Sequence, residues 1–149
     1  MPYIYNSNKS DSTLLLFISS SIFFDDFFSA FLIYFIYPVF WTEAPAKLVG
    51  WFDRVWTFGF AYGTKRMKLL EKALILATTG NTKERLEKSG LLYSMKKVML
   101  GDRLFERVKQ SDFVVFDAMS RELESRTANW EKYITQAYNH GKKFFCDMK

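Results

Sequence analysis

Two short stretches of this chain carry residues that suit the binding of a flat, partly polar ligand. The first, Pro38–Thr42, offers the aromatic face of Trp41 and backbone N–H groups that can meet ring heteroatoms. The second, Thr78–Gly80, offers two hydroxyl groups and a glycine, which lets the backbone approach a ligand closely. Each stretch follows an apolar run, and loops that follow neighbouring parallel strands meet at the carboxyl edge of their sheet. The pattern therefore predicts a site for a planar ligand such as a flavin.

The same residues also have a purely structural interpretation. Phe40, Trp41 and Trp51 can belong to the hydrophobic core, because large aromatic side chains are mostly buried in globular domains. The Thr-Thr-Gly stretch can be an ordinary turn. Residue types alone give the two interpretations equal weight.

Other kinds of site lack the residues that they need. His140 and Cys146 are the only histidine and the only cysteine. A His/Cys metal site or a His-based catalytic triad has too few members, so we predict no metal and assign no catalytic side chain. An internal disulfide cannot form with one cysteine, which fits a reducing compartment, and we expect a cytoplasmic protein.

The charge pattern argues against two classes of partner. The 21 Lys and Arg residues exceed the 16 Asp and Glu residues, but no basic run reaches five, so the pattern favours a solvated surface over a nucleic-acid tail. Residues 13–37 are apolar, but Asp25 and Asp26 divide them into pieces of about half the ~20 residues that a spanning helix needs. Each carboxylate would cost about 2.5–3.5 kcal/mol near the centre of a bilayer. We therefore favour a buried strand over residues 30–37 and not membrane insertion.

Strands that alternate with helices are predicted by the apolar periodicity. We expect strands over residues 30–37, 73–79 and 113–116. We expect helices over residues 44–56, 82–90, 92–108 and 120–141, the third broken near Gly101, with Thr42, Asn81 and Ser120 as N-caps. This alternation predicts the α/β class with a parallel sheet.

Two of these helices carry apolar stripes that we expect to be buried. The stripe of the helix over 44–56 comprises Leu48, Trp51, Phe52 and Val55, and that of the last helix comprises Leu123, Trp130, Tyr133, Ile134, Ala137 and Tyr138. Gly50, inside the earlier helix, predicts the close approach of a neighbouring element. Gly141 is expected to end the last helix.

Several of these motifs, taken in order, resemble the flavodoxin-like NAD(P)H:quinone oxidoreductases. The matching stretches are Tyr37–Ala46, Gly50–Val55, Gly59–Gly63 and Ala77–Gly80. The resemblance implies a flavodoxin-like, doubly wound parallel sheet and a flavin, FAD or FMN, at the interface of a homodimer. It also implies two-electron transfer of hydride from NAD(P)H through the flavin to a quinone.

The resemblance also assigns site residues by position. The cofactor-binding residues that it implies are Pro38, Val39, Phe40, Trp41, Thr42, Thr78, Thr79, Gly80 and Asn81. Among them, Trp41 would pack against the flavin ring. Phe60 and Tyr62 would lie near the substrate pocket.

The chain departs from the family pattern before residue 30. The family's usual first strand, its phosphate-binding loop and the helix that follows have no counterpart, and the first glycine is Gly50. We therefore expect an N-terminally truncated member of the family: a Phe-rich leader over residues 1–29, a partial flavodoxin-like domain over 30–140 and a tail over 141–149. The alternative to an active oxidoreductase is a non-catalytic family fragment that acts only through dimerisation.

Overall fold

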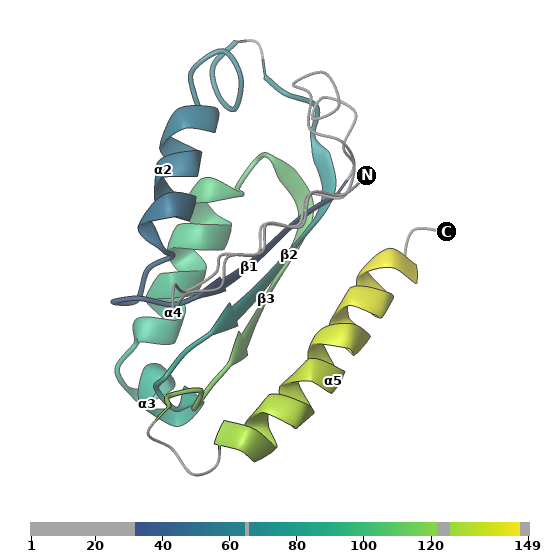
Figure 1. Cartoon of the computed structure of the whole chain (residues 1–149). Coiled ribbons are helices and arrows are strands. Elements are labelled where there is room, and N and C mark those ends of the chain that lie inside the picture. Colours follow the sequence, from purple (N-terminus) through teal and green to yellow (C-terminus); the bar gives the residue numbers. More distant parts are fainter. Residues whose placement is uncertain (1–31, 65, 122–125, 147–149) are drawn as a thin grey trace.

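The computed structural model describes residues 32–64, 66–121 and 126–146, which form a parallel sheet with helices on both faces (Figure 1). The strands are β1 (Leu32–Pro38), β2 (Leu70–Thr78) and β3 (Val108–Phe116), in the order β1-β2-β3. The helices are α2 (Ala46–Val55), α3 (Lys83–Lys88), α4 (Leu91–Lys96), the π-helix η1 (Lys97–Arg103) and α5 (Arg126–Cys146). The predicted α/β class with a parallel sheet is confirmed.

The carboxyl ends of the three strands lie level with one another. In the parallel pairing of β1 with β2, Pro38 lies opposite Thr78, and in that of β2 with β3, Thr78 lies opposite Phe116. The loops that follow the strands therefore begin side by side at one edge of the sheet.

Each strand has the burial pattern that its position in the sheet requires. In β1, Ile33 and Phe35 are buried on one face, whereas Tyr34 and Ile36 are half-buried on the other, because successive side chains of a strand alternate. β2 is buried along most of its length, as expected of a central strand that has helices on both sides.

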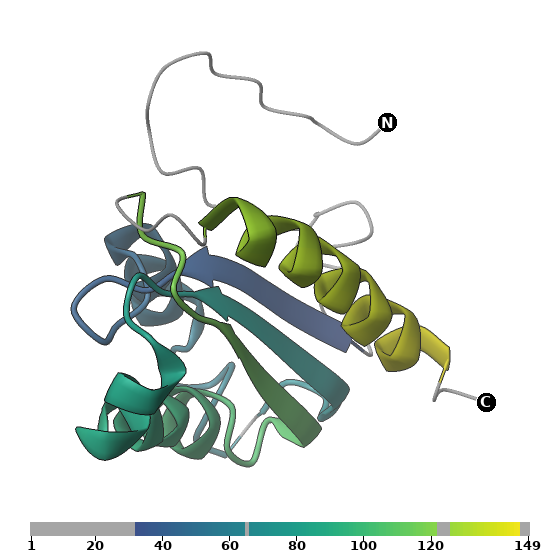
Figure 2. The ribbon, with the colours of Figure 1, turned by 90° about the horizontal axis from the view of Figure 1, so that it is seen from below.

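Two helical layers enclose the sheet (Figure 1, Figure 2). α2, α4 and η1 pack on one face and α5 on the other. Between the sheet and the first of these layers, Phe35, Leu48 and Ile75 are at most 1% exposed. Burial of each such side chain contributes about 1.5–3 kcal/mol, so this face is the main core.

The start of α2 differs from the prediction. Its N-cap is Pro45 and not Thr42, which has a φ of 69°. The chain first makes a tight turn through Thr42, so the helix cannot begin until that turn is complete. No atom of the described residues lies within 4 Å of a Cβ placed on Gly50, so the predicted close approach is not found in this part of the chain.

The helices between β2 and β3 also correct two expectations. Thr82, and not Asn81, caps α3, because the Oγ1 atom of Thr82 accepts the backbone N–H of Arg85 at 3.3 Å. The helical run does not break at Gly101, which lies inside η1, and it ends at Arg103. β3 begins at Val108, so the third strand starts earlier than predicted.

α5 ends later than predicted and buries a different stripe. It continues through Gly141 to Cys146, so the prediction that Gly141 ends this helix is wrong. Tyr133 is buried and Ala137 is half-buried, as expected. The predicted burial of three other members of the stripe is wrong, because the exposed large side chains of α5 are Trp130, Ile134 and Tyr138. The proposed leader over 1–29 and residues 122–125, which include Leu123, lie outside the described residues.

No helix within the described ranges is both long enough and apolar enough to cross a membrane.

Candidate functional site

A strained two-residue turn follows β1 and carries the most exposed aromatic side chain of the described chain. Phe40 and Glu43 exchange two backbone hydrogen bonds of 2.9 and 2.8 Å across the turn. Between them, Trp41 and Thr42 have φ angles of 51° and 69°, in the left-handed region that residues other than glycine seldom adopt. The Trp41 side chain is 99% exposed, so its own packing does not offset this strain. Strain of this kind is concentrated at ligand sites.

An arginine from η1 holds the end of this turn. Arg103 donates two hydrogen bonds to the Glu43 carboxylate, at 2.9 and 3.2 Å, in a bidentate pair. The guanidinium also lies 5.0 Å from the centre of the Phe52 ring, and the Arg103 carbonyl accepts the indole N–H of Trp56 at 2.5 Å. The Arg103 side chain is only 13% exposed, so solvent screens this ion pair less than a surface pair.

Tyr37, the residue before Pro38, lies buried near the same pair. Burial raises the pKa of Tyr37 far above its usual range, with a lowering effect from Arg103 and a raising effect from Glu43. Tyr37 therefore stays neutral at physiological pH and acts as a core residue, in contact with the apolar layer under α2.

The second predicted loop is fixed by its backbone. Thr79 is buried, its N–H donates to the Phe116 carbonyl and its carbonyl accepts from Met119, both at 2.9 Å. The Thr79 Oγ1 atom accepts the Asn81 N–H at 3.2 Å. A Cβ placed on Gly80 would lie 3.5 Å from Ser120, an ordinary contact, so the fold itself does not require glycine there.

A third loop, over residues 117–120, is joined to the second loop and was missed by the sequence analysis. One carboxylate oxygen of Asp117 accepts the backbone N–H of Lys83 at 2.7 Å, and the other accepts the hydroxyl of Tyr133. The Ala118 N–H donates to the Asn81 carbonyl at 3.0 Å. Asp117 thus ties α3 and α5 to this edge. The sequence signal that could have indicated this loop is the position of the Asp117 carboxylate directly after an apolar strand.

The Asp117–Tyr133 contact shifts both pKa values. Burial raises the pKa of Asp117, but the hydrogen bonds from Tyr133 and from the Lys83 N–H outweigh it and leave the pKa below its usual value. Burial and the neighbouring carboxylate together raise the pKa of Tyr133 to about 12. At neutral pH the pair is therefore a carboxylate and a neutral phenol.

The three loops meet at the carboxyl edge of the sheet. The Val39 N–H donates to the Thr78 carbonyl at 2.8 Å, which joins the first loop to the second. The edge thus brings together the nine residues predicted to bind cofactor: Pro38, Val39, Phe40, Trp41, Thr42, Thr78, Thr79, Gly80 and Asn81. Among the described residues, the N–H groups of Trp41, Thr42 and Gly80 have no acceptor. This edge can therefore offer donors and one aromatic face to a flat ligand.

Phe60 and Tyr62 lie at the opposite end of the sheet. Arg107, just before β3, donates from Nε to the Ala61 carbonyl at 3.1 Å, and its own carbonyl accepts the N–H of Leu70 at the start of β2. In Figure 1 the arrowheads of β2 and β3 point toward α3, and the loop after α2 lies at the other end. Within one chain, the structure does not bring these two aromatic residues to the predicted cofactor residues.

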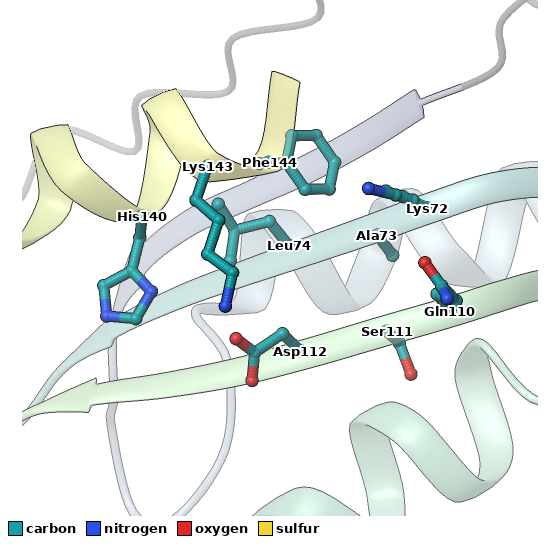
Figure 3. A pocket seen from close by; sticks show the side chains of 9 residues that line it. All are labelled: Lys72, Ala73, Leu74, Gln110, Ser111, Asp112, His140, Lys143 and Phe144. Carbon is teal, nitrogen blue, oxygen red and sulfur yellow. The ribbon is translucent and has the colours of Figure 1, made fainter. Parts of the chain in front are cut away.

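A separate cavity of about 210 Å³ lies between the amino halves of β2 and β3 and the last turns of α5 (Figure 3). It is lined by Lys72, Ala73, Leu74, Gln110, Ser111, Asp112, His140, Lys143 and Phe144. None of the predicted site residues lines it. In the parts of the chain that are described, no cluster of three or more His, Cys, Asp or Glu residues could hold a metal ion.

Comparison with known proteins places this fold in a family. The profile of the flavodoxin-like fold family matches residues 16–140, so the chain belongs to that family. Its structure is similar to that of an NAD(P)H:quinone oxidoreductase from Methanothermobacter marburgensis, with a TM-score of 0.60 and 38% identity, over 76% of this chain and 62% of that one.

Two curated relatives match shorter regions. An uncharacterized NAD(P)H oxidoreductase of Bacillus subtilis is 40% identical over 63 residues, which are 42% of this chain and 36% of that protein. The ribosyldihydronicotinamide dehydrogenase (quinone) of Homo sapiens is 42% identical over 65 residues, 40% of this chain and 28% of that protein. The chain thus spans about a third of the length of the curated relatives that it matches.

Proposed function

We propose that this chain is a flavin-dependent NAD(P)H:quinone oxidoreductase. The observation that carries the proposal is the strained Phe40–Glu43 turn, which presents an exposed Trp41 beside the fixed Thr79 loop at the carboxyl edge. The names of the relatives, which include NAD(P)H oxidoreductases and quinone dehydrogenases, support the same chemistry.

The edge fits the ring of a flavin. Trp41 offers an aromatic face, and the N–H groups of Thr42 and Gly80, which have no acceptor among the described residues, suit the carbonyl oxygens and nitrogens of an isoalloxazine. The bound flavin would supply hydride transfer from NAD(P)H to the quinone. The protein's own role would be to hold the flavin ring. Trp41 would pack against the ring, and the ion pair between Glu43 and Arg103 would keep the Phe40–Glu43 turn in place.

A homodimer is the second part of the proposal. Phe60 and Tyr62 flank Ala61, which is bonded to Arg107 at the amino end of β3, whereas Trp41 follows the carboxyl end of β1. These two residues can therefore line a quinone pocket beside Trp41 only if a second copy supplies them. The Tyr62 side chain is 45% exposed and the neighbouring Phe58 is 71% exposed, which suits a contact surface. A cytoplasmic location, with NADH or NADPH as donor and FMN or FAD as cofactor, completes the proposal.

The test is NAD(P)H-dependent quinone reduction by the full chain after incubation with FMN or FAD. The assay follows the loss of NADH or NADPH absorbance with a benzoquinone and with a naphthoquinone, and sedimentation analysis gives the oligomeric state. Quinone-dependent turnover by a dimer supports the proposal. A dimer that retains flavin poorly and shows no turnover supports the alternative, a non-catalytic fragment that acts through dimerisation.

A further inference from the structure

The cavity between α5 and the sheet lies where an apolar face of the sheet becomes polar. Four side chains of this face belong to the apolar cluster under α5, namely Leu74 and Leu76 of β2 and Val114 and Phe116 of β3. Side chains two positions apart in a strand share a face, so the same face continues toward the amino ends of both strands. The residues there are Lys72, Gln110 and Asp112, and all three line the cavity (Figure 3).

α5 brings further polar groups to the same place. Tyr133 and Phe144 of α5 are buried against the sheet, and His140 lies four residues before Phe144, on the same side of the helix. Lys143 also lines the cavity, and its side chain is directed toward Asp112 of β3 (Figure 3). The helix and the sheet thus direct polar side chains into one hollow.

The cations of this cavity exceed its carboxylates. Lys72 and Lys143 line it, and Asp112 is the one carboxylate among the described residues that do so. Glu71, the neighbouring acid of β2, is held by Lys109 at 2.6 Å. Within the described parts of the chain Lys143 forms no ion pair, not even with Asp112. A hollow with an excess of positive charge attracts anionic ligands.

The size and the apolar part of the lining suit a small organic molecule. The cavity volume of about 210 Å³ is several times the ~30 Å³ that a water molecule occupies in the liquid, and it is below the ~300 Å³ of the smallest typical pockets for drug-sized ligands. Leu74 and Phe144 are buried and border the cavity, so they offer an apolar wall. A short apolar group can lie against this wall.

We propose that this cavity binds small organic anions, in which a carboxylate or phosphate group is joined to a short apolar body. The anionic group lies beside the Lys143 ammonium, where the His140 ring and the Gln110 amide can donate hydrogen bonds. The apolar body lies against Phe144, and the charge of Asp112 limits the affinity. The cavity contains none of the predicted flavin-binding residues, so this proposal does not depend on the proposed function.

The test uses His140 as a reporter, because it is the only histidine of the chain. The full chain, without a histidine tag, is titrated with benzoate and with phenyl phosphate at constant pH and ionic strength. Nuclear magnetic resonance follows the ring protons of His140. Benzamide is the uncharged control for benzoate, and acetate and inorganic phosphate are the controls that lack the apolar body.

The proposal predicts a saturable shift of the His140 signals with benzoate, with phenyl phosphate or with both, and this result also identifies the preferred anionic group. Benzamide, acetate and inorganic phosphate should bind at least about fivefold more weakly, because each lacks one of the two recognised parts. The absence of a saturable shift with both aromatic anions would overturn the proposal. Binding of benzamide or of acetate as tight as that of benzoate would overturn it too.

Two pairs of variants separate this site from the general surface charge. Lys143→Met should weaken binding of the aromatic anion about fivefold, as expected for the loss of one partly exposed ion pair. Lys142→Met removes the same charge from an exposed neighbour that does not line the cavity, and should change the affinity by less than about twofold.

The second pair tests the opposing charge. Asp112→Asn should tighten binding about threefold, because it removes a negative charge from the cavity. Asp53→Asn, at an exposed position on α2, is its control and should have no effect. Circular dichroism checks that all four variants are folded. Equal losses of affinity in Lys143→Met and Lys142→Met would show that only the overall charge matters, and would contradict the proposal.

Discussion

The two ends of the sheet are held in different ways. At the carboxyl edge, backbone hydrogen bonds join three successive loops. The side chain of Trp41 is almost fully exposed there. At the amino end, the aromatic loop over 58–62 is anchored mainly by Arg107 and by a hydrogen bond from Met67 to Phe60, while Phe58 and Tyr62 remain exposed.

Under the proposed function, the carboxyl edge binds the ligand (the ligand edge) and the amino end contacts a second copy (the contact edge). Fixed backbone loops with spare donors suit a rigid planar ligand, because a preorganised site loses little entropy when the ligand binds. Exposed aromatic side chains on a short loop suit contact with another chain. A site that uses residues from both ends therefore requires two copies of the chain, and the predictions below test that division.

The largest expected effect is a difference in the free energy of unfolding between variants that break an ion pair at each end of the sheet. Arg103→Met leaves the Glu43 carboxylate without its bidentate partner, so the free energy of unfolding should fall by about 1–3 kcal/mol. The matched control is Arg66→Met, whose ion pair with Glu106 is more than half exposed on both sides and should cost about 0.5 kcal/mol or less. Urea unfolding measures both, and equal losses would remove the distinction between the ends.

A smaller effect concerns the ligand edge alone. Trp41→Ala should weaken flavin binding about tenfold or more, because it removes the stacking face. The unfolding free energy should change by about 0.5 kcal/mol or less, since the side chain is 99% exposed. Tyr93→Ala, an exposed aromatic on α4, is the control and should leave flavin affinity unchanged. Unaltered affinity in Trp41→Ala would show that the site is wrongly assigned.

The contact edge should respond in the opposite way. If the Tyr62 side chain of one copy lines the quinone pocket of another, Tyr62→Ala should raise the KM for quinone about fivefold, as expected for one lost aromatic contact. Flavin affinity should stay at the wild-type value, because the loop that holds Tyr62 is bonded to Arg107 at the amino end of β3, whereas Trp41 follows the carboxyl end of β1. Steady-state kinetics at saturating NAD(P)H measure the first quantity and flavin titration the second. A lower flavin affinity with unchanged KM would reverse the assigned roles.

The carboxyl edge was predictable because its residues follow directly on apolar runs. Pro38–Thr42 and Thr78–Asn81 could be placed there from the sequence, since loops after parallel strands share an edge. Asp117 and Tyr133 were not found because their contact joins residues 16 apart across two elements. Only the packing of α5 on the sheet makes that pair visible.

The errors on α5 have a physical explanation as well. Helical periodicity shows that a stripe is apolar but not what it faces, so Ile134 was expected in the core and is exposed. Gly141 costs a helix only about 1 kcal/mol relative to Ala, and burial of Phe144 beyond it offsets that cost. The helix therefore continues to Cys146.

The smallest expected effect tests the tie between α5 and the ligand edge. Below pH 10 the neutral Tyr133 contributes stability through its hydrogen bond to Asp117, and this contribution is lost as the pH rises from the ordinary tyrosine value of about 10 to the folded value of about 12. Tyr133→Phe should lower the unfolding free energy by about 0.5–1 kcal/mol at neutral pH and should flatten the loss between pH 10 and 12.

Tyr138→Phe is the control for this prediction, because the Tyr138 side chain is 69% exposed. Thermal unfolding across the alkaline range measures all three proteins. The role given to Tyr133 would be wrong if its variant followed the wild-type pH profile.

The central claim is that the loops at the carboxyl edge hold a flavin. It is tested most directly by the visible absorption spectrum of the purified chain after incubation with FMN or FAD and desalting. The account predicts a retained flavin band with FMN or FAD and its loss in Trp41→Ala, with the fold of the variant intact. A colourless wild-type chain after both incubations would contradict the account and would leave the carboxyl edge as a structural remnant of the family site.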